Sequence, residues 1–390
     1  MVRAISLDRK VLIFRYFAAY DKIYLLNQVK KGKGRKHLTD VMKKSDKLIR
    51  LWLISGAFFV LTMVVIGGIT RLTGSGLSIV EWDLVYGILP PLNEQQWNIA
   101  FDKYKTSPEY QKINYNMDLS GFKQIFFWEY LHRLIGRFTG FLFIIPFAIF
   151  YVKGYFSKTI LKKVLLIFTL GLSQGVMGWL MVKSGLSDIP HVSHYRLAAH
   201  LVLAFFIIAS IVWAINSLQS NKNKKGQLSP IALLLSGLLL LQIIYGAFVA
   251  GLKAGYFYNT YPDMGGFFIP PGIFDKTPAL INLLENAVTV QFVHRWIPLF
   301  IVGLLLYMKF GTKEFKKSYK ITETTNYLFF TIVVQIALGI NTLLSGVNII
   351  SGVLHQIMAA VIFMLSVQLI YQTREVNEKQ EEKQTILEPV

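Results

Sequence analysis

The chain has 390 residues, of which 53% are hydrophobic and 16% are charged, and its mean hydropathy is +0.46. This composition excludes an ordinary soluble domain and indicates a protein whose solvent is a bilayer. The formal charge of +19 does not indicate nucleic-acid binding, because Lys and Arg stand in short segments between long apolar runs. Since the chain has no cysteine, disulfides, iron–sulfur clusters, cysteine zinc sites and covalently attached haem are excluded.

Residues 1–49 form a basic extension that lacks the apolar segment of a signal peptide. Its aspartates argue against a mitochondrial transit peptide, so we expect a cytoplasmic extension of a bacterial protein. Eight apolar runs follow that are long enough to span, since ~20 helical residues cross a hydrocarbon core of ~30 Å. They cover 51–70, 125–152, 162–182, 195–217, 230–252, 288–309, 325–345 and 350–371. Backbone groups in lipid must bond within their own segment, so each run is expected to be a helix.

The connections between the predicted spans alternate in charge. Lysine-rich segments precede the first span and join spans two and three, four and five, and six and seven. The long connections 71–124 and 253–287 contain most of the acidic residues, and the short turn 346–349 is uncharged. The positive-inside rule therefore predicts that both termini are cytoplasmic and that two large loops lie outside. Residues 373–390 are expected to form a cytoplasmic tail, which is polar and expected to be disordered after Arg374.

The two halves of the chain repeat each other. Residues of the third span recur 161 positions further on: Gln174, Gly178, Ser184 and Gly185 correspond to Gln335, Gly339, Ser345 and Gly346. His132-Arg133 recurs as His294-Arg295, and Gly67-Gly68 resembles Gly246-Ala247. Four spans in each repeat preserve the orientation, which predicts parallel repeats. We expect an all-α membrane protein of two pseudo-symmetric four-helix bundles, 50–218 and 228–372, with cofactor sites inside each bundle.

Four of the seven histidines lie within spans two, four, six and eight: His132, His200, His294 and His355. These spans all run from outside to inside, and each histidine lies about six to eight residues from its predicted helix start. The four imidazoles should therefore share one level near the outer surface. Ionisable groups in spans are rare and indicate function, although one such histidine alone could form an interhelical hydrogen bond. The others, His37, His191 and His194, are interpreted as solvated or structural residues of non-spanning segments.

Haem iron takes two axial imidazoles from facing helices, and an apolar wall suits its macrocycle. A carboxylate di-metal site would need several buried glutamates, which the spans lack. Zinc held by four histidines would leave the large aromatic-lined pockets without a role. We therefore predict one haem between His132 and His200 and another between His294 and His355. A di-haem electron-transfer subunit of the cytochrome b kind and a transporter are the alternative functions.

Glu129 stands three residues before His132 and shares its helix face, whereas Gln291 occupies the equivalent place before His294. A carboxylate can exchange protons and an amide cannot, so chemistry confined to one half should occur in the first. The alternative is that Glu129 only pairs with Arg133 or Arg196 at the membrane surface.

Several arginines lie near the level of the predicted haem ligands. Because arginine binds carboxylates bidentately, Arg133, Arg196 and Arg295 are candidates for contacting haem propionates. Arg137 has the same possible role or anchors the helix at the interface.

A set of segments between residues about 50 and 372 carries a family resemblance. They are GGITRLTGSGLSIVEW at 67–82, Pro90-Pro91, EYLHR at 129–133, RLAAH at 196–200, GAFVAGLKAG at 246–255, NTYPDMGG at 259–266, QFVHRW at 291–296 and His355. On these segments the chain resembles the haem A synthase family, in its longer, mitochondrial-type branch. Some bacterial members carry a cysteine pair in an outer loop, which this chain lacks.

The resemblance implies an enzyme that oxidises a ring methyl of haem O to a formyl group by two hydroxylations, giving haem A. It implies that His132 and His200 ligate the substrate haem O, that His294 and His355 ligate a haem b cofactor, and that Glu129 is the acidic catalytic residue. The implied location is the bacterial inner membrane, with the haem sites towards the outer face. Candidate partners are a haem O synthase, assembly factors of the terminal oxidase and a second copy of the chain, but not nucleic acid.

Overall fold

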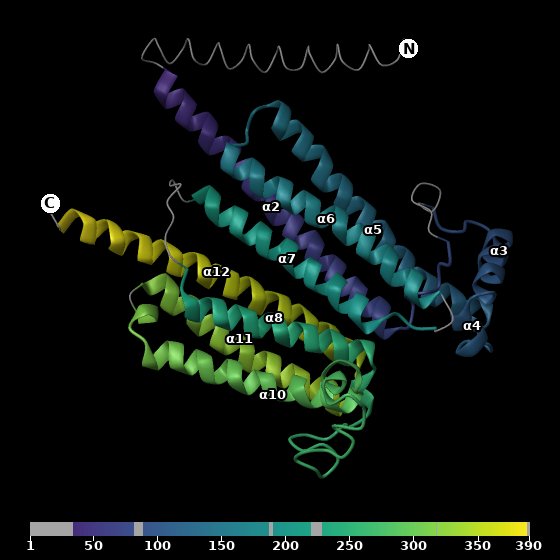
Figure 1. Cartoon of the computed structure of the whole chain (residues 1–390). Coiled ribbons are helices and arrows are strands. Elements are labelled where there is room, and N and C mark those ends of the chain that lie inside the picture. Colours follow the sequence, from purple (N-terminus) through teal and green to yellow (C-terminus); the bar gives the residue numbers. More distant parts are fainter. Residues whose placement is uncertain (1–33, 82–88, 187–189, 220–227, 317, 388–390) are drawn as a thin grey trace, which may run out of the picture.

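The computed structural model describes residues 34–81, 89–186, 190–219, 228–316 and 318–387 (Figure 1). Within these ranges eight helices are long and apolar enough to cross a membrane. They are α2 (Gly34–Leu72), α5 (Leu119–Val152), α6 (Lys158–Gly185), α7 (His194–Gln219), α8 (Pro230–Gly251), α10 (Ala287–Leu306), α11 (Tyr319–Leu344) and α12 (Ile349–Leu387). The prediction of eight spans in an all-α integral membrane protein is confirmed, and each predicted run lies within one of the eight spanning segments or passes its end by one residue.

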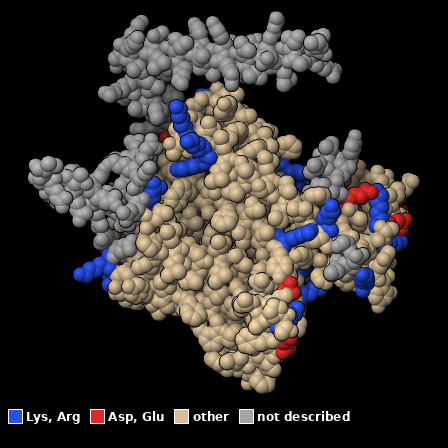
Figure 2. Space-filling model, in the orientation of Figure 1, with Lys and Arg blue, Asp and Glu red and all other residues tan. Residues whose placement is uncertain are grey.

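The surface of the molecule matches a bilayer environment. Figure 2 shows one face, on which charged side chains gather towards the ends of the helices while the broad surface between them carries other residues. Large apolar side chains such as Phe141, Phe300 and Phe330 are exposed on this part of the helices. In water such a surface would cost free energy, so lipid chains are the solvent that suits it.

Several helix boundaries differ from the predictions because hydropathy detects the apolar centre of a span and not its polar ends. Helix α2 begins at Gly34, within the segment predicted as an extension, and α11 begins at Tyr319. Helix α5 begins at Leu119, where the Asp118 carboxylate accepts the Gly121 N–H at 2.8 Å as an N-cap. Helix α12 continues to Leu387, so the prediction of a disordered tail is wrong over 375–387. That segment is rich in Glu, Lys and Gln, which are strong helix formers.

The same helix pairs are in contact in both halves of the chain. In the first half α2 packs against α5 and α7, and α6 packs against α7. In the second half α8 packs against α10 and α12, and α11 packs against α12. The halves meet where α2 and α7 contact α12 and where α7 contacts α8, for example at the rings of Phe205 and Phe363, 5.4 Å apart. The pseudo-symmetry and the exact domain boundaries stay predictions.

Helices α5 and α10 each contain an internal proline, Pro146 and Pro298. Proline lacks an N–H, so the carbonyl four residues earlier loses its helical donor. In α5 this carbonyl belongs to Leu142, and it accepts Nε1–H of Trp52 from α2 at 3.0 Å. In α10 it belongs to His294, and it accepts the side-chain amide of Gln242 from α8 at 3.0 Å. A side chain of the preceding span therefore satisfies each freed carbonyl.

The two long connections lie at one end of the helices, opposite the start of α2 and the end of α12 (Figure 1). The first contains α3 (Glu94–Lys105) and α4 (Pro108–Lys112), whose aromatic residues pack on the start of α5. The second contains short turns and α9 (Asn282–Glu285). Arg71 at the end of α2 donates to the carbonyls of Ala250 and Gly251, at 2.9 and 3.4 Å, at the end of α8. This cation at a helix C-terminus joins the halves.

Candidate functional site

Each of the four intramembrane histidines lies on a glycine of a neighbouring helix. A Cβ placed on that glycine would approach the imidazole to 3.2 Å at three of the four positions and to 2.8 Å at the last. The pairs are Gly67 with His132, Gly178 with His200, Gly246 with His294, and Gly339 with His355. Any larger residue would have to displace the ring, so glycine here permits close approach of the helix to the imidazole.

Three of these rings also contact a glutamine that stands one helical turn before the glycine. The amide nitrogens of Gln174 and Gln335 lie 3.2 and 3.3 Å from Nε2 of His200 and His355. Gln242 lies 3.5 Å from Nε2 of His294. An amide NH₂ can only donate, so Nε2 accepts and carries a lone pair. Nδ1–H of His355 donates to the main-chain carbonyl of Gln335 at 3.1 Å, which leaves the lone pair on Nε2. A metal ligated by this nitrogen would take the place of the Gln335 amide hydrogen.

The structure brings together the two histidines predicted for the second half. The ring centroids of His294 and His355 are 6.5 Å apart, with 75° between the ring planes. A metal–imidazole bond of about 2 Å on each side, with each centroid about 1 Å behind its nitrogen, places the centroids of a bis-imidazole site about 6 Å apart. The observed centroid separation is close to this value, and iron ligation by this pair stays a prediction. In the first half His132 and His200 are close enough to interact electrostatically.

A multi-residue site for a non-haem metal does not compete with this interpretation. Within the described part of the chain, no group of three or more His, Cys, Asp or Glu side chains is placed to hold a metal ion. Pairs of imidazoles, rather than a cluster of four, are what the helices bring together. This arrangement suits a haem, which supplies four equatorial ligands itself, better than it suits zinc, which takes four from the protein.

Glu129 is 3% exposed and belongs to a polar cluster with the segment that follows α2. One carboxylate oxygen accepts the Ser78 hydroxyl at 2.7 Å and the Ile79 N–H at 2.8 Å. The other accepts the Arg133 guanidinium at 2.7 Å. The pairing with Arg133 that the sequence suggested as an alternative is thus present. Arg196 does not take part; it donates to the Leu180 carbonyl at 2.6 Å.

The second half places an arginine in the same way but has Gln291, an amide, at the position of the Glu129 carboxylate. Arg295 donates to the carbonyls of Tyr258, Thr260 and Asp263 at 2.7, 2.8 and 3.0 Å. The amide of Gln291 donates to the same Tyr258 carbonyl at 2.9 Å.

Arg133 likewise holds the carbonyls of Ile79 and Glu81 at 2.9 and 3.0 Å. Arg133 and its repeat counterpart Arg295 therefore hold backbone of the two long connections in this structure. Their contact with haem propionates stays a prediction, as does that of Arg196.

Two positional expectations for histidines need correction. His194 is the first residue of α7 and not part of the loop; its ring packs on Tyr195 and Phe248, with centroids 4.0 and 5.3 Å away. His132 lies more than three turns from the start of α5, because that helix extends outward to Leu119. His191 lies in the loop before α7, whereas the side chain of His37 lies outside the described residues.

Comparison with known proteins gives a consistent result. The COX15-CtaA family model, described as cytochrome oxidase assembly protein, matches residues 50–367. A protein named heme A synthase from Flavobacterium johnsoniae is 44% identical over 332 residues, covering 83% of this chain and 97% of the relative. Another from Nitrosomonas eutropha is 40% identical over 333 residues, covering 84% and 94%. The chain belongs to the haem A synthase family.

The family predicted from short sequence segments is therefore confirmed. The matched range includes all four intramembrane histidines, Glu129 and both long connections. In this member of the haem A synthase family, the adjacent glycines of α2 face both halves of the molecule. Gly67 lies against His132, and Gly68 lies against the side chain of Gln356, the residue after His355. One turn of α2 thus contacts the surroundings of both histidine pairs.

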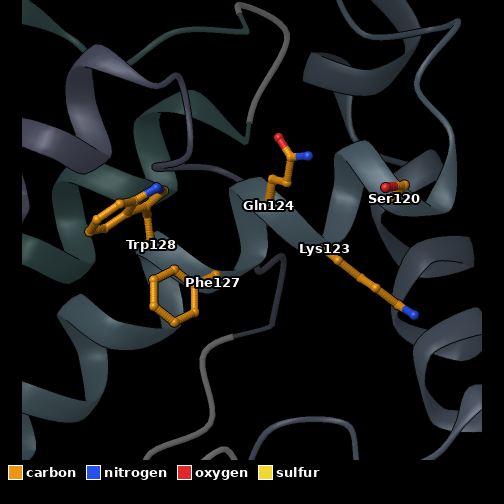
Figure 3. A pocket seen from close by; sticks show the side chains of 5 residues that line it. All are labelled: Ser120, Lys123, Gln124, Phe127 and Trp128. Atoms are coloured by element: carbon orange, nitrogen blue, oxygen red, sulfur yellow. The ribbon is translucent and has the colours of Figure 1, made fainter. Parts of the chain in front are cut away.

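A surface groove of about 430 Å³ lies at the N-terminal end of α5 (Figure 3). Its lining residues all come from the first turns of that helix: Ser120, Lys123, Gln124, Phe127 and Trp128. Figure 3 shows that the ring of Phe127 and the side chain of Lys123 point away from each other. Since one helix supplies the whole lining, the groove is a notch in the surface and separate from the histidine pairs.

Glu109 on α4 is a buried acid that sequence reasoning missed, because the predicted outer loop gave no reason to bury it. It is 8% exposed and accepts the Tyr104 hydroxyl at 3.1 Å. Burial raises the pKa of this carboxyl to about 7. The Tyr104 hydrogen bond and the charges of Arg71 and Lys253 act in the opposite direction.

Proposed function

We propose that this protein oxidises a ring methyl of haem O to a formyl group by successive hydroxylations, giving haem A for terminal oxidases. The observation that carries the proposal is a buried carboxylate three residues before one ligand histidine, present in only one of two otherwise similar histidine sites. Family membership supports it, since relatives more than 40% identical are named heme A synthase.

In this proposal the two histidine pairs hold different haems. His132 and His200 ligate the iron of the substrate haem O, and His294 and His355 ligate a haem b cofactor. The neutral imidazoles and the ring spacing in the second half support iron ligation. Bound haem b supplies one-electron chemistry, which would connect the reaction to an electron acceptor.

Glu129 is proposed to accept a proton or to stabilise positive charge next to the reacting methyl. Its burial makes such a charge effect large, because little water screens it. Ser78, Ile79 and Arg133 fix both carboxylate oxygens, so no reorganisation is needed during reaction. Gln291, at the same place in the second half, cannot exchange a proton. The chemistry is therefore assigned to the first half.

The proposed location is the bacterial inner membrane, with both termini cytoplasmic and the haem sites near the outer face. Loop charge supports this orientation. The arginines that follow His132 and His294 both contact the long connections assigned to the outside, which supports the placement of the histidines near that surface.

The test is to replace Glu129 by Gln, purify the full-length protein and identify its extracted haems. We expect haem O or a hydroxylated intermediate to accumulate and haem A to fall by about 100-fold, within the range that proton-transfer residues contribute. Gln291→Met is the matched control, because it changes the equivalent position of the second half and should leave haem A production intact. Normal haem A output from Glu129→Gln would contradict the assignment. A di-haem electron-transfer subunit would yield no formyl haem from either protein.

A further inference from the structure

Gln242 contacts His294 at two points, its ring and its backbone. The amide nitrogen lies 3.0 Å from the His294 carbonyl oxygen and 3.5 Å from Nε2 of the ring. The carbonyl needs this donor because Pro298, four residues later, has no N–H to offer. An unpaired carbonyl in this environment would cost about 1–3 kcal/mol. Proline and glutamine therefore act together on the residue that carries the imidazole.

The ring itself is confined from the other side. Gly246, one turn after Gln242 on α8, lies so close to His294 that an added Cβ would be 3.2 Å from the ring. The glutamine and the glycine thus present one face of α8 to the backbone and side chain of a single histidine. His294 has little freedom to tilt without breaking one of these contacts.

The first half lacks this arrangement around His132. Met63 stands one turn before Gly67, where the second half has Gln242, and a thioether cannot donate a hydrogen bond. Gly136 stands four residues after His132, where the second half has Pro298, so α5 keeps a backbone N–H at this point. The Met63 methyl lies against Gly136, 3.3 Å from the position of an added Cβ. His132 packs against Gly67, but Met63 stands where the second half has the amide of Gln242.

We infer that Gln242 is a positioning residue that fixes His294 through the carbonyl freed by Pro298, so that the second half retains its haem while the first half can exchange its own. The inference rests on the proposed function, which assigns a resident haem b to the second half and a substrate to the first. Groups that orient a metal-ligating histidine typically change metal affinity by about 10–100-fold. A substrate site must release its product, whereas a cofactor site must not.

The test measures haem b release from the purified full-length protein to an excess of a haem-scavenging apoprotein, followed by absorbance. Gln242→Met, which gives the second half the residue of the first, should accelerate haem b release about 10–100-fold. In a Pro298→Ala background the backbone regains its donor to the His294 carbonyl. The same Gln242→Met change should there accelerate release several-fold less. This rescue is a result that general loss of packing would not produce.

Trp52→Phe is the matched control, because it removes the donor to the other carbonyl freed by a proline, that of Leu142 in the first half. It should leave haem b release unchanged. The inference is overturned if Gln242→Met does not accelerate release, if its effect is equal in both backgrounds, or if Trp52→Phe has the same effect. Should Gln242→Met alone fail to accumulate, accumulation of the double variant supports the inference, and failure of both overturns it.

A second measurement addresses the first half. Met63→Gln introduces an amide at the place of Gln242 and should slow the release of the haem held there, without changing haem b release. Failure of this inference and failure of the proposed function give different results. If extracted haems never include haem A, the proposed reaction fails. If Gln242→Met leaves the rate of haem b release unchanged, only the positioning role of Gln242 fails.

Discussion

The two halves of this protein place histidines on glycines in the same way but surround them with different polar groups. In the first half a buried carboxylate, Glu129, pairs with Arg133 next to a ligand candidate. In the second half Gln291 takes the carboxylate's place, and Gln242 holds the backbone of His294. The comparison teaches that similar imidazole pairs do not determine what a site does. In the proposed function, the neighbouring side chains determine which half carries out chemistry and which retains a cofactor.

The largest effect is expected from a substitution of a glycine that packs against a histidine, the feature that both halves share. Gly339→Ala places a Cβ 2.8 Å from Cε1 of His355, closer than real contacts allow. The ring must move, so we expect haem b occupancy to fall by at least about 10-fold, as for other losses of ligand orientation. Absorbance of the purified protein measures this. Gly237→Ala on α8, which meets open space, is the control and should keep its haem.

A second prediction compares the two arginines that hold the outer loops. Arg133→Met leaves the Glu129 carboxylate buried without its cation, which should cost about 3–5 kcal/mol of unfolding free energy. Arg295→Met leaves backbone carbonyls without donors and removes a cation near the exposed Asp263 carboxylate. The lost hydrogen bonds should cost about 1–3 kcal/mol. Denaturant unfolding in detergent measures both. Equal losses would show that the ion pair adds nothing to the first half.

A third prediction concerns Glu109, for which the second half has no counterpart. Its folded pKa of about 7 lies above the ordinary value of 4.5, so the folded state holds a proton that the unfolded state releases between these values. Stability should therefore fall as pH rises from 4.5 to 7 and stay low above 7. Glu109→Gln removes this loss and should stabilise the protein by up to about 3 kcal/mol at pH 8.

Thermal unfolding of Glu109→Gln at pH 4 and pH 8 checks the sign of this effect. The variant and the parent should unfold at similar temperatures at pH 4, where both side chains are uncharged. A stabilisation at pH 4 that disappears at pH 8 would contradict the raised pKa. Asp102→Asn, on the exposed face of α3, is the control and should show no such crossover.

The smallest expected effect concerns the contact between the halves. Arg71→Met removes the cation from the C-terminal carbonyls of α8, at Ala250 and Gly251. The loss should be about 1 kcal/mol, the usual value for a cation at a helix C-terminus. Hydrogen exchange at the end of α8 should rise while α6 stays unchanged. Unchanged exchange at both places would mean that this contact does not stabilise the junction.

Much of the fold was readable because bilayer thickness sets the length of an apolar run. All eight spans were found, but not the capped polar start of α5 at Asp118 or the helical continuation of α12 to Leu387. Hydropathy carries no information on such polar turns. Their stability comes from capping and helix propensity, which act within a few residues.

The candidate site was predicted in part. The histidine pair of the second half lies together as expected, and the recurrence of Gln174 and Gly178 as Gln335 and Gly339 marked residues that contact histidines. Their role was not predicted, since a repeat shows equivalence but not contact. Gln242 was missed because its counterpart is a methionine. The signal for it was Pro298, placed one turn after His294.

The adjacent glycines of α2 connect the surroundings of the two histidine sites. Gly67 lies against His132, and Gly68 lies against Gln356, beside His355, so a side chain at either position would push outward on a different site. At Gly67 an added side chain would press on the His132 ring, whereas at Gly68 it would displace the end of the Gln356 side chain. Because one turn of α2 packs against both sites, a substitution that moves this turn would alter the packing around both of them.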